Sequence, residues 1–296
     1  MRGMQVPSHV EYARATSIGH ALSLLTSPEA RPLAGGHSLI PMMKLRLAQP
    51  ELVVDITGLR ELAYITLGKG AEGGDELRIG ALTTHAALLG DDLVDEMFPI
   101  LTDAERVIAD PIVRNWGTVG GSLCQADPSE DLSAAFSAAR ATAVIATASG
   151  SRTVPVRDFH LGPYQTVIEP GELLTEIRVP VRDGTGSAYE KVERRAGDWS
   201  IAAVGAVLTI EDNAVMTAGI GLTAVGAPHF AATEAEDHLT GRPATAESFA
   251  AAAELAAAHC RPVADQRGPE DYKRALVVEL AQRALARAAA RAGGER

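Results

Sequence analysis

Two pairs of adjacent glycines, each flanked by a hydroxyl side chain, constrain this chain more than any other feature of its sequence. The first pair lies in Ala34-Gly35-Gly36-His37-Ser38, and the second lies in Thr118-Val119-Gly120-Gly121-Ser122. Adjacent glycines let backbone N–H groups approach a ligand without a Cβ in the way, and consecutive turn amides bind anions. Two such segments favour a ligand with two linked phosphates, such as a dinucleotide.

The first pair also has an explanation that needs no ligand. It follows an apolar run that ends at Leu33 and precedes a helical pattern, so it can be a tight turn between a strand and a helix. Ser38 can cap that helix or donate to a phosphate.

The second pair lies in a segment from 110 to 131 that is rich in Gly, Pro and Asp, and we expect this segment to be irregular. A structureless loop of about 20 residues in a compact domain is usually functional or wrongly assigned.

A third glycine pattern, Gly68, Gly70 and Gly73, has the spacing of the Rossmann dinucleotide fingerprint. That fingerprint must leave a strand and open a helix. Here two strand-like runs, 62–67 and 77–79, flank the glycines and predict a β-hairpin. We therefore expect no nucleotide at this triplet.

The order of the predicted elements indicates two domains. Strands and helices alternate in the first third of the chain, whereas three strand-like runs followed by three helices occupy the last third. Turn formers at 180–187 separate the two regions. We predict an α+β fold with domains 1–180, divided into lobes of about 1–58 and 59–180, and 187–292.

Composition excludes several classes of function. The formal net charge of −11 argues against nucleic acid or anionic lipid as a partner. No apolar run approaches the roughly 18 to 20 residues that span a bilayer, and no signal peptide is evident, so we expect a cytoplasmic protein. The two cysteines, Cys124 and Cys260, cannot by themselves hold an iron–sulfur cluster or zinc, and we expect both to be small buried groups. We identify no metal ligand set and no catalytic residue.

Two charged residues are further candidates for a nucleotide site. The carboxylate of Asp131 can accept hydrogen bonds from ribose or ribityl hydroxyls, but it equally suits the N-cap of the following helix. Lys191, in a predicted strand, can stabilise a reduced flavin or bind phosphate, or it can be a solvated surface lysine. His37 is better explained by loop packing or by proximity to phosphate than by acid catalysis.

Several segments together resemble one family. The sequence RPLAGGHSLIPMMKLRL at 31–47 and the sequence NWGTVGGSLCQADPSED at 115–131 are similar to the FAD-binding medium subunit of aerobic carbon monoxide dehydrogenases. GELL at 171–174, YEK at 189–191 and RRAGDW at 194–199 extend the resemblance over nearly the whole chain.

The resemblance implies a two-lobed FAD-binding domain of the vanillyl-alcohol-oxidase (PCMH) type and a C-terminal flavoprotein domain with a three-stranded sheet and helices. It implies pyrophosphate contacts at Ala34, Gly35, Gly36, His37 and Ser38 and at Thr118, Val119, Gly120, Gly121 and Ser122. Similarity to the flavin domain of xanthine dehydrogenases adds Asp131, Leu174 and Lys191. We see no flavin-attachment residue at either glycine pair and expect FAD to be bound noncovalently.

The resemblance also implies partners. A large molybdenum-cofactor subunit and a small [2Fe-2S] subunit would complete a dimer of heterotrimers, in which electrons reach FAD from the clusters and leave to a quinone or another acceptor. Peripheral membrane contact would occur only through that complex. Alternatives are a related molybdenum hydroxylase acting on an N-heterocycle, aldehyde or purine, a stand-alone flavin oxidoreductase, or a scaffold without flavin. Trp199 would either shield the flavin or lie in the core.

Overall fold

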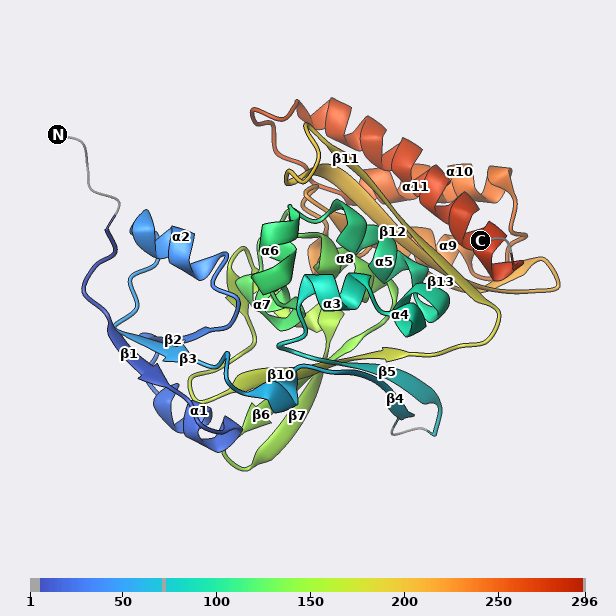
Figure 1. Cartoon of the computed structure of the whole chain (residues 1–296). Coiled ribbons are helices and arrows are strands. Elements are labelled where there is room, and N and C mark those ends of the chain that lie inside the picture. Colours follow the sequence, from blue (N-terminus) through green and yellow to red (C-terminus); the bar gives the residue numbers. More distant parts are fainter. Residues whose placement is uncertain (1–5, 71–72, 295–296) are drawn as a thin grey trace.

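The described residues form four sheets, one of them a two-stranded ribbon, with helices packed on them (Figure 1). The computed structural model describes residues 6–70 and 73–294, so residues 1–5 and 71–72 of the first predicted domain lie outside the described part. The fold is α+β, as predicted. Within the described ranges, no helix combines the length and the apolar character needed to cross a membrane.

The first lobe is a small parallel sheet. Its strands β1 (Glu11–Arg14), β3 (Leu52–Asp55) and β2 (Ala30–Leu33) lie in the order β1-β3-β2, with both outer strands parallel to β3. Helix α1 (Ile18–Leu24) begins at Ser17, whose side chain accepts a hydrogen bond from the His20 N–H. Helix α2 (Leu39–Lys44) follows β2 directly, so the first glycine pair forms the β2–α2 connection.

The second lobe is an antiparallel sheet of order β4-β5-β10-β6-β7, covered by six helices. Its strands are β4 (Ile65–Lys69), β5 (Asp75–Gly80), β10 (Leu173–Pro180), β6 (Thr142–Thr147) and β7 (Gly150–Pro155), and a separate ribbon joins β8 (His160–Gly162) and β9 (Gln165–Thr166). Its helices are α3 (His85–Leu89), α4 (Asp92–Met97), α5 (Pro99–Val107), α6 (Pro111–Trp116), α7 (Val119–Gln125) and α8 (Asp131–Ala138). The third glycine pattern lies in the β4–β5 hairpin, as predicted.

The segment from 110 to 131 is largely helical, so our expectation of an irregular loop was wrong. Asp110 caps α6 by accepting from the Val113 N–H, and Pro111 occupies the first turn, where a missing N–H is harmless. Thr118 caps α7 in the same way by accepting from the Gly121 N–H. Residues that we interpreted as turn formers therefore cap or begin two short helices.

The C-terminal region contains the antiparallel sheet β11 (Thr185–Glu193), β12 (Ser200–Glu211) and β13 (Ala214–Thr223). Helices α9 (Thr233–Leu239), α10 (Ala246–His259) and α11 (Glu270–Ala292) follow. Helix α11 packs on β11 and β12 through an apolar face that includes Val277, Leu280 and Ala284, as its spacing predicts. Helices α5 and α8 of the second lobe also pack on this sheet, so β12 is buried along most of its length.

Two glycines allow α8 to pack closely on this sheet. A Cβ at Gly219 would lie 1.9 Å from the Ala138 carbonyl oxygen, and one at Gly221 would lie 2.0 Å from that of Ala134. Neither oxygen can move without displacing the α8 backbone, so the two regions are in contact at a distance that only glycine permits.

We predict that Gly219→Ala lowers the free energy of unfolding by roughly 1 to 3 kcal/mol, the usual cost of overpacking. Gly19→Ala is the matched control, because nothing lies within 4 Å of a Cβ there. It should leave stability equal or slightly higher. Denaturant unfolding of both variants checks this, and equal stabilities would contradict the close contact.

Candidate functional site

One cavity of about 790 Å³ brings the predicted site residues together. This volume is typical of ligand pockets, which span roughly 300 to 1,000 Å³. Residues of both lobes and of the C-terminal region line it. The predicted residues among them are Ala34, Gly35, Gly36, His37, Ser38, Thr118, Gly120, Gly121, Ser122, Asp131, Leu174 and Lys191. Val119 is the exception, because its side chain is buried in the core of the second lobe.

The first glycine segment has the form of an anion-binding turn. None of the N–H groups of Gly35, Gly36, His37 and Ser38 has a hydrogen-bond partner among the described residues. Gly36 has φ +75°, which strains any residue with a Cβ. Ser38 precedes α2 but makes no side-chain cap bond, so its hydroxyl is also unused. Of the two interpretations of this segment, the structure favours the one with a ligand.

The first glycine segment packs against the residues that precede the second. A Cβ at Gly35 would lie 2.0 Å from the Trp116 carbonyl oxygen and 2.8 Å from the Gly117 Cα. Gly35 is therefore required by protein packing as well as by any ligand. Segments 80 residues apart in the chain meet at this point because the β2–α2 connection touches the end of α6.

The second glycine segment is not a backbone nest, and that interpretation was wrong. The Val119, Gly120 and Ser122 N–H groups donate to the carbonyl oxygens of Thr83, Ala81 and Thr118, at 2.9, 3.0 and 2.9 Å. The Gly121 N–H donates to Thr118 Oγ1. A Cβ at Gly120 would lie 2.6 Å from that of Ala81, so this glycine allows α7 to pack on the residue after β5. What this segment presents to a ligand is side-chain hydroxyls.

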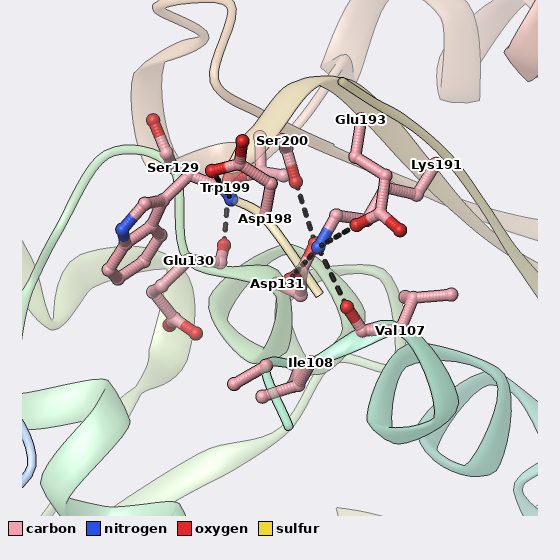
Figure 2. A network of polar contacts seen from close by, with 12 residues as sticks. Val107, Ile108, Ser129, Glu130, Asp131, Lys191, Glu193, Asp198, Trp199 and Ser200 are labelled. Carbon is pink, nitrogen blue, oxygen red and sulfur yellow. Dashed lines mark hydrogen bonds and ion pairs between the residues drawn. The ribbon is translucent and has the colours of Figure 1, made fainter. Parts of the chain in front are cut away.

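Asp131 and Lys191 form a buried ion pair in the cavity wall (Figure 2). The Lys191 ammonium lies 2.8 Å from Asp131 Oδ2 and donates to the Val107 carbonyl oxygen at 3.0 Å. Hydroxyls of Tyr189 and Ser200 both donate to Asp131 Oδ1 at 2.8 Å. Burial raises the pKa of Asp131, and Lys191 opposes that change. Lys191 is therefore not a solvated surface lysine.

Glu130, which we did not predict, is the N-cap of α8 in place of Asp131. Its carboxylate accepts from the Leu132 and Ser133 N–H groups at 2.8 and 2.7 Å. It also accepts from the Ser122 hydroxyl at 3.1 Å, which connects the cap to the second glycine segment. Burial raises the pKa of Glu130 to about 7.

Trp199 and Cys124 also line the cavity. Trp199 is 45% exposed, so it is not a core residue. Its backbone N–H donates to Asp198 Oδ1 at 2.9 Å. Cys124 is only partly buried, whereas Cys260 is buried as expected. Burial raises the pKa of the Cys124 thiol to about 12, so the thiol is neutral near pH 7.

Sequence reasoning missed His85, which is buried at the start of α3 and lines the cavity. Its Nδ1 lies 2.9 Å from Oε1 and 3.1 Å from Oε2 of Glu105, which is fully buried. The two residues are 20 positions apart on different helices and belong to no motif. No local pattern in the sequence predicts that these two side chains are in contact.

Comparison with known proteins gives matches over nearly the whole chain. Residues 8–182 match the model of the FAD binding domain in molybdopterin dehydrogenase, and residues 187–288 match that of the CO dehydrogenase flavoprotein C-terminal domain. The carbon monoxide dehydrogenase medium chain of Afipia carboxidovorans is 42% identical, over 97% of this chain and 99% of its own length. The glyceraldehyde dehydrogenase medium chain of Sulfolobus acidocaldarius is 38% identical, over 94% of this chain and 98% of its own length.

Among solved structures, a chain of reconstituted CO dehydrogenase from Oligotropha carboxidovorans superposes with a TM-score of 0.91 at 41% identity. The match covers 97% of this chain and 99% of that one. The fold of this chain is therefore that of a chain in a solved CO dehydrogenase structure.

We predict that Gly36→Val raises the dissociation constant for FAD about tenfold or more, because a β-branched residue cannot adopt the φ that aims the free amides. Fluorescence titration of the flavin-free chain measures this. Gly241→Val is the matched control, since Gly241 has φ +80° but lies outside the cavity lining. It should lose stability and keep its FAD affinity. Equal effects of both variants on binding would exclude the first segment as a contact.

We predict that Glu130 makes the flavin-free chain less stable as pH rises from about 4.5 to about 7. Over this window the folded state keeps a proton that the unfolded state has lost, so stability falls with pH, by roughly 3 kcal/mol at 1.4 kcal/mol per pKa unit. Glu130→Gln should remove this part of the pH dependence. Urea unfolding of the wild type and the variant at several pH values checks this prediction. If the free energy of unfolding depends on pH in the same way in both, the raised pKa of Glu130 is contradicted.

Proposed function

The chain belongs to the family of FAD-binding subunits of molybdopterin dehydrogenases, and from this membership we propose that it carries electrons within a molybdenum hydroxylase. The FAD that this chain would hold would supply the chemistry for receiving electrons from [2Fe-2S] clusters of a small partner subunit and for their transfer to a quinone or another acceptor. A large molybdenum-cofactor subunit oxidises the substrate. The observation that carries the proposal is the set of unpaired amides at Gly35–Ser38 on the wall of a cavity large enough for a dinucleotide.

The residues present fit FAD. Among the described residues, the N–H groups of Gly35 to Ser38 and the Ser38 hydroxyl have no acceptor, and oriented donors of this kind suit a diphosphate. Leu174 from β10 and the half-exposed Trp199 also line the cavity and would offer apolar surface to the isoalloxazine. Asp131 and Lys191, whose ion pair forms part of the cavity wall, would be further contacts of the cofactor.

Carbon monoxide is the substrate we propose for the complex, since carbon monoxide dehydrogenase medium chains are similar to this chain over nearly its full length. Related hydroxylases acting on an aldehyde, N-heterocycle or purine are the alternative, favoured by the likeness to a glyceraldehyde dehydrogenase medium chain. The substrate is selected at the molybdenum site, on another polypeptide.

We also propose the division into domains 1–180 and 187–292, supported by the turn between β10, which ends at Pro180, and β11, which begins at Thr185. A cytoplasmic location and a dimer of heterotrimers complete the proposal. The C-terminal domain is expected to require its neighbour, because α5 and α8 cover one face of its sheet.

We predict that acid precipitation of the full chain releases all of its flavin as FAD. The isolated chain should not be bleached by carbon monoxide under anaerobic conditions, because this chain lacks cysteine sets for [2Fe-2S] clusters. Reconstitution with the large and small subunits should restore bleaching by the native substrate. Absorbance at the flavin bands measures each step.

Four results would contradict this proposal in whole or in part. Flavin retained in the acid pellet would show a covalent link, and recovery of FMN would exclude the dinucleotide. Bleaching of the isolated chain by an organic substrate would indicate a self-sufficient flavin oxidoreductase. Bleaching of the complex by an aldehyde or N-heterocycle, and not by carbon monoxide, would favour the alternative substrate class.

A further inference from the structure

Two buried basic side chains line the cavity, and they differ in what remains available to a ligand. The Lys191 ammonium lies 2.8 Å from Asp131, 3.0 Å from the Val107 carbonyl oxygen and 3.3 Å from Glu193. Two carboxylates therefore already compensate its single charge. His85 is different, because Glu105 contacts only one of its two ring nitrogens.

The second ring nitrogen of His85 faces the cavity. Nε2 has no hydrogen-bond partner among the described residues, and it is not among the buried polar atoms that lack a partner, so the cavity reaches it. Glu105 orients the ring by binding Nδ1, and Glu105 itself is inaccessible to solvent. A carboxylate that holds one imidazole nitrogen directs the other toward a ligand.

His85 lies beside the place where the first glycine segment meets the chain before α7. Its backbone N–H donates to the Gly117 carbonyl oxygen at 3.1 Å. A Cβ at Gly117 would lie 2.9 Å from His85 Cδ2 and 3.3 Å from Nε2. Gly35, where the unpaired amides begin, contacts the same glycine, since its Cβ would lie 2.8 Å from the Gly117 Cα. The imidazole and the start of the amide turn therefore both lie against Gly117.

The charges around His85 favour the imidazolium. Burial alone would lower its pKa, but Glu105 on α5 outweighs burial, and the net pKa is raised. Glu130 at the start of α8 acts in the same direction, and Arg114 on α6 opposes them. The acidic residues of α4, the remaining helix packed on α3, are exposed at the surface. An imidazolium donates from both nitrogens, so Nε2–H is available as a charged donor.

We propose that His85 is a direct contact of the FAD diphosphate, to which Nε2–H donates, and that Glu105 is its positioning residue. This inference rests on the proposed FAD function and adds a charged donor to the neutral amides of the first glycine segment. A dianionic diphosphate in a cavity whose wall also holds Glu130 and Asp131 needs such a donor.

The first test measures FAD binding and the flavin midpoint potential of the full chain with His85→Gln. Hydrogen bonds to charged groups correspond to roughly tenfold to a hundredfold in affinity, so we expect the dissociation constant to rise by at least about tenfold. The midpoint potential should stay unchanged, because the diphosphate is remote from the redox-active ring. His160→Gln is the matched control, since His160 is a partly buried histidine outside the cavity lining, and it should bind FAD like the wild type.

The second test uses Glu105→Gln, which keeps a hydrogen-bond acceptor for Nδ1 and removes the charge. The His85 pKa should then fall, so FAD binding by this variant should begin to weaken at a lower pH than binding by the wild type. A purely structural role of Glu105 would lower affinity equally at every pH.

The outcomes are separable. Failure of the wild-type chain to bind FAD would overturn the proposed function itself. Normal FAD affinity in His85→Gln, or a shifted midpoint potential, would overturn only the diphosphate contact. If His85→Gln does not fold, Glu105→Gln decides. A pH profile of FAD affinity parallel to that of the wild type overturns the inference, and a profile displaced to lower pH supports it.

Discussion

The buried ion pair of Asp131 and Lys191 is the interaction on which the geometry of the cavity depends. Asp131 begins α8 in the second lobe, and Lys191 lies on β11 of the C-terminal sheet. Removal of one partner of such a pair leaves an uncompensated buried charge, which lowers the free energy of unfolding by about 3 to 5 kcal/mol. The hydroxyls of Tyr189 and Ser200, also from the C-terminal sheet, fill the remaining acceptor sites of the carboxylate. The same interaction therefore holds the two regions together and sets one wall of the site.

Close backbone contacts complete that arrangement, and glycine is what permits them. Gly219 and Gly221 bring the C-terminal sheet against the carbonyl oxygens of α8, and Gly120 brings α7 against Ala81. Gly35 brings the first lobe against the end of α6. These glycines serve packing between elements, while Gly36 serves conformation through its positive φ. The first glycine pair thus meets two different requirements. A Cβ at Gly35 would clash with a neighbouring backbone, whereas a Cβ at Gly36 would strain the backbone conformation.

The cavity offers donors to an anionic ligand without an excess of positive charge. Glu130 and Asp131 line it, Glu105 is buried against His85, and the chain as a whole is strongly acidic. Each carboxylate is matched by a local donor: His85 for Glu105, backbone amides for Glu130, and Lys191 for Asp131. What remains for a ligand is a small set of oriented N–H donors, and in a low-dielectric wall such donors act more strongly than they would in water.

Local patterns in the sequence determined much of this protein. The strands and helices of the C-terminal region, the β4–β5 hairpin and the first glycine turn follow from periodicity and turn chemistry, which act between near neighbours in the chain. The resemblance located both glycine segments on one cavity, although Val119 proved to be a core residue. Only the tertiary structure decided which donors are unused, because that depends on partners distant in sequence: the amides of α7 are satisfied by Thr83 and Ala81, whereas those at Gly35–Ser38 are not. The tertiary structure also decided that His85 contacts Glu105. Packing sets which side chains pair across helices, and such a pair produces no periodic pattern in the sequence.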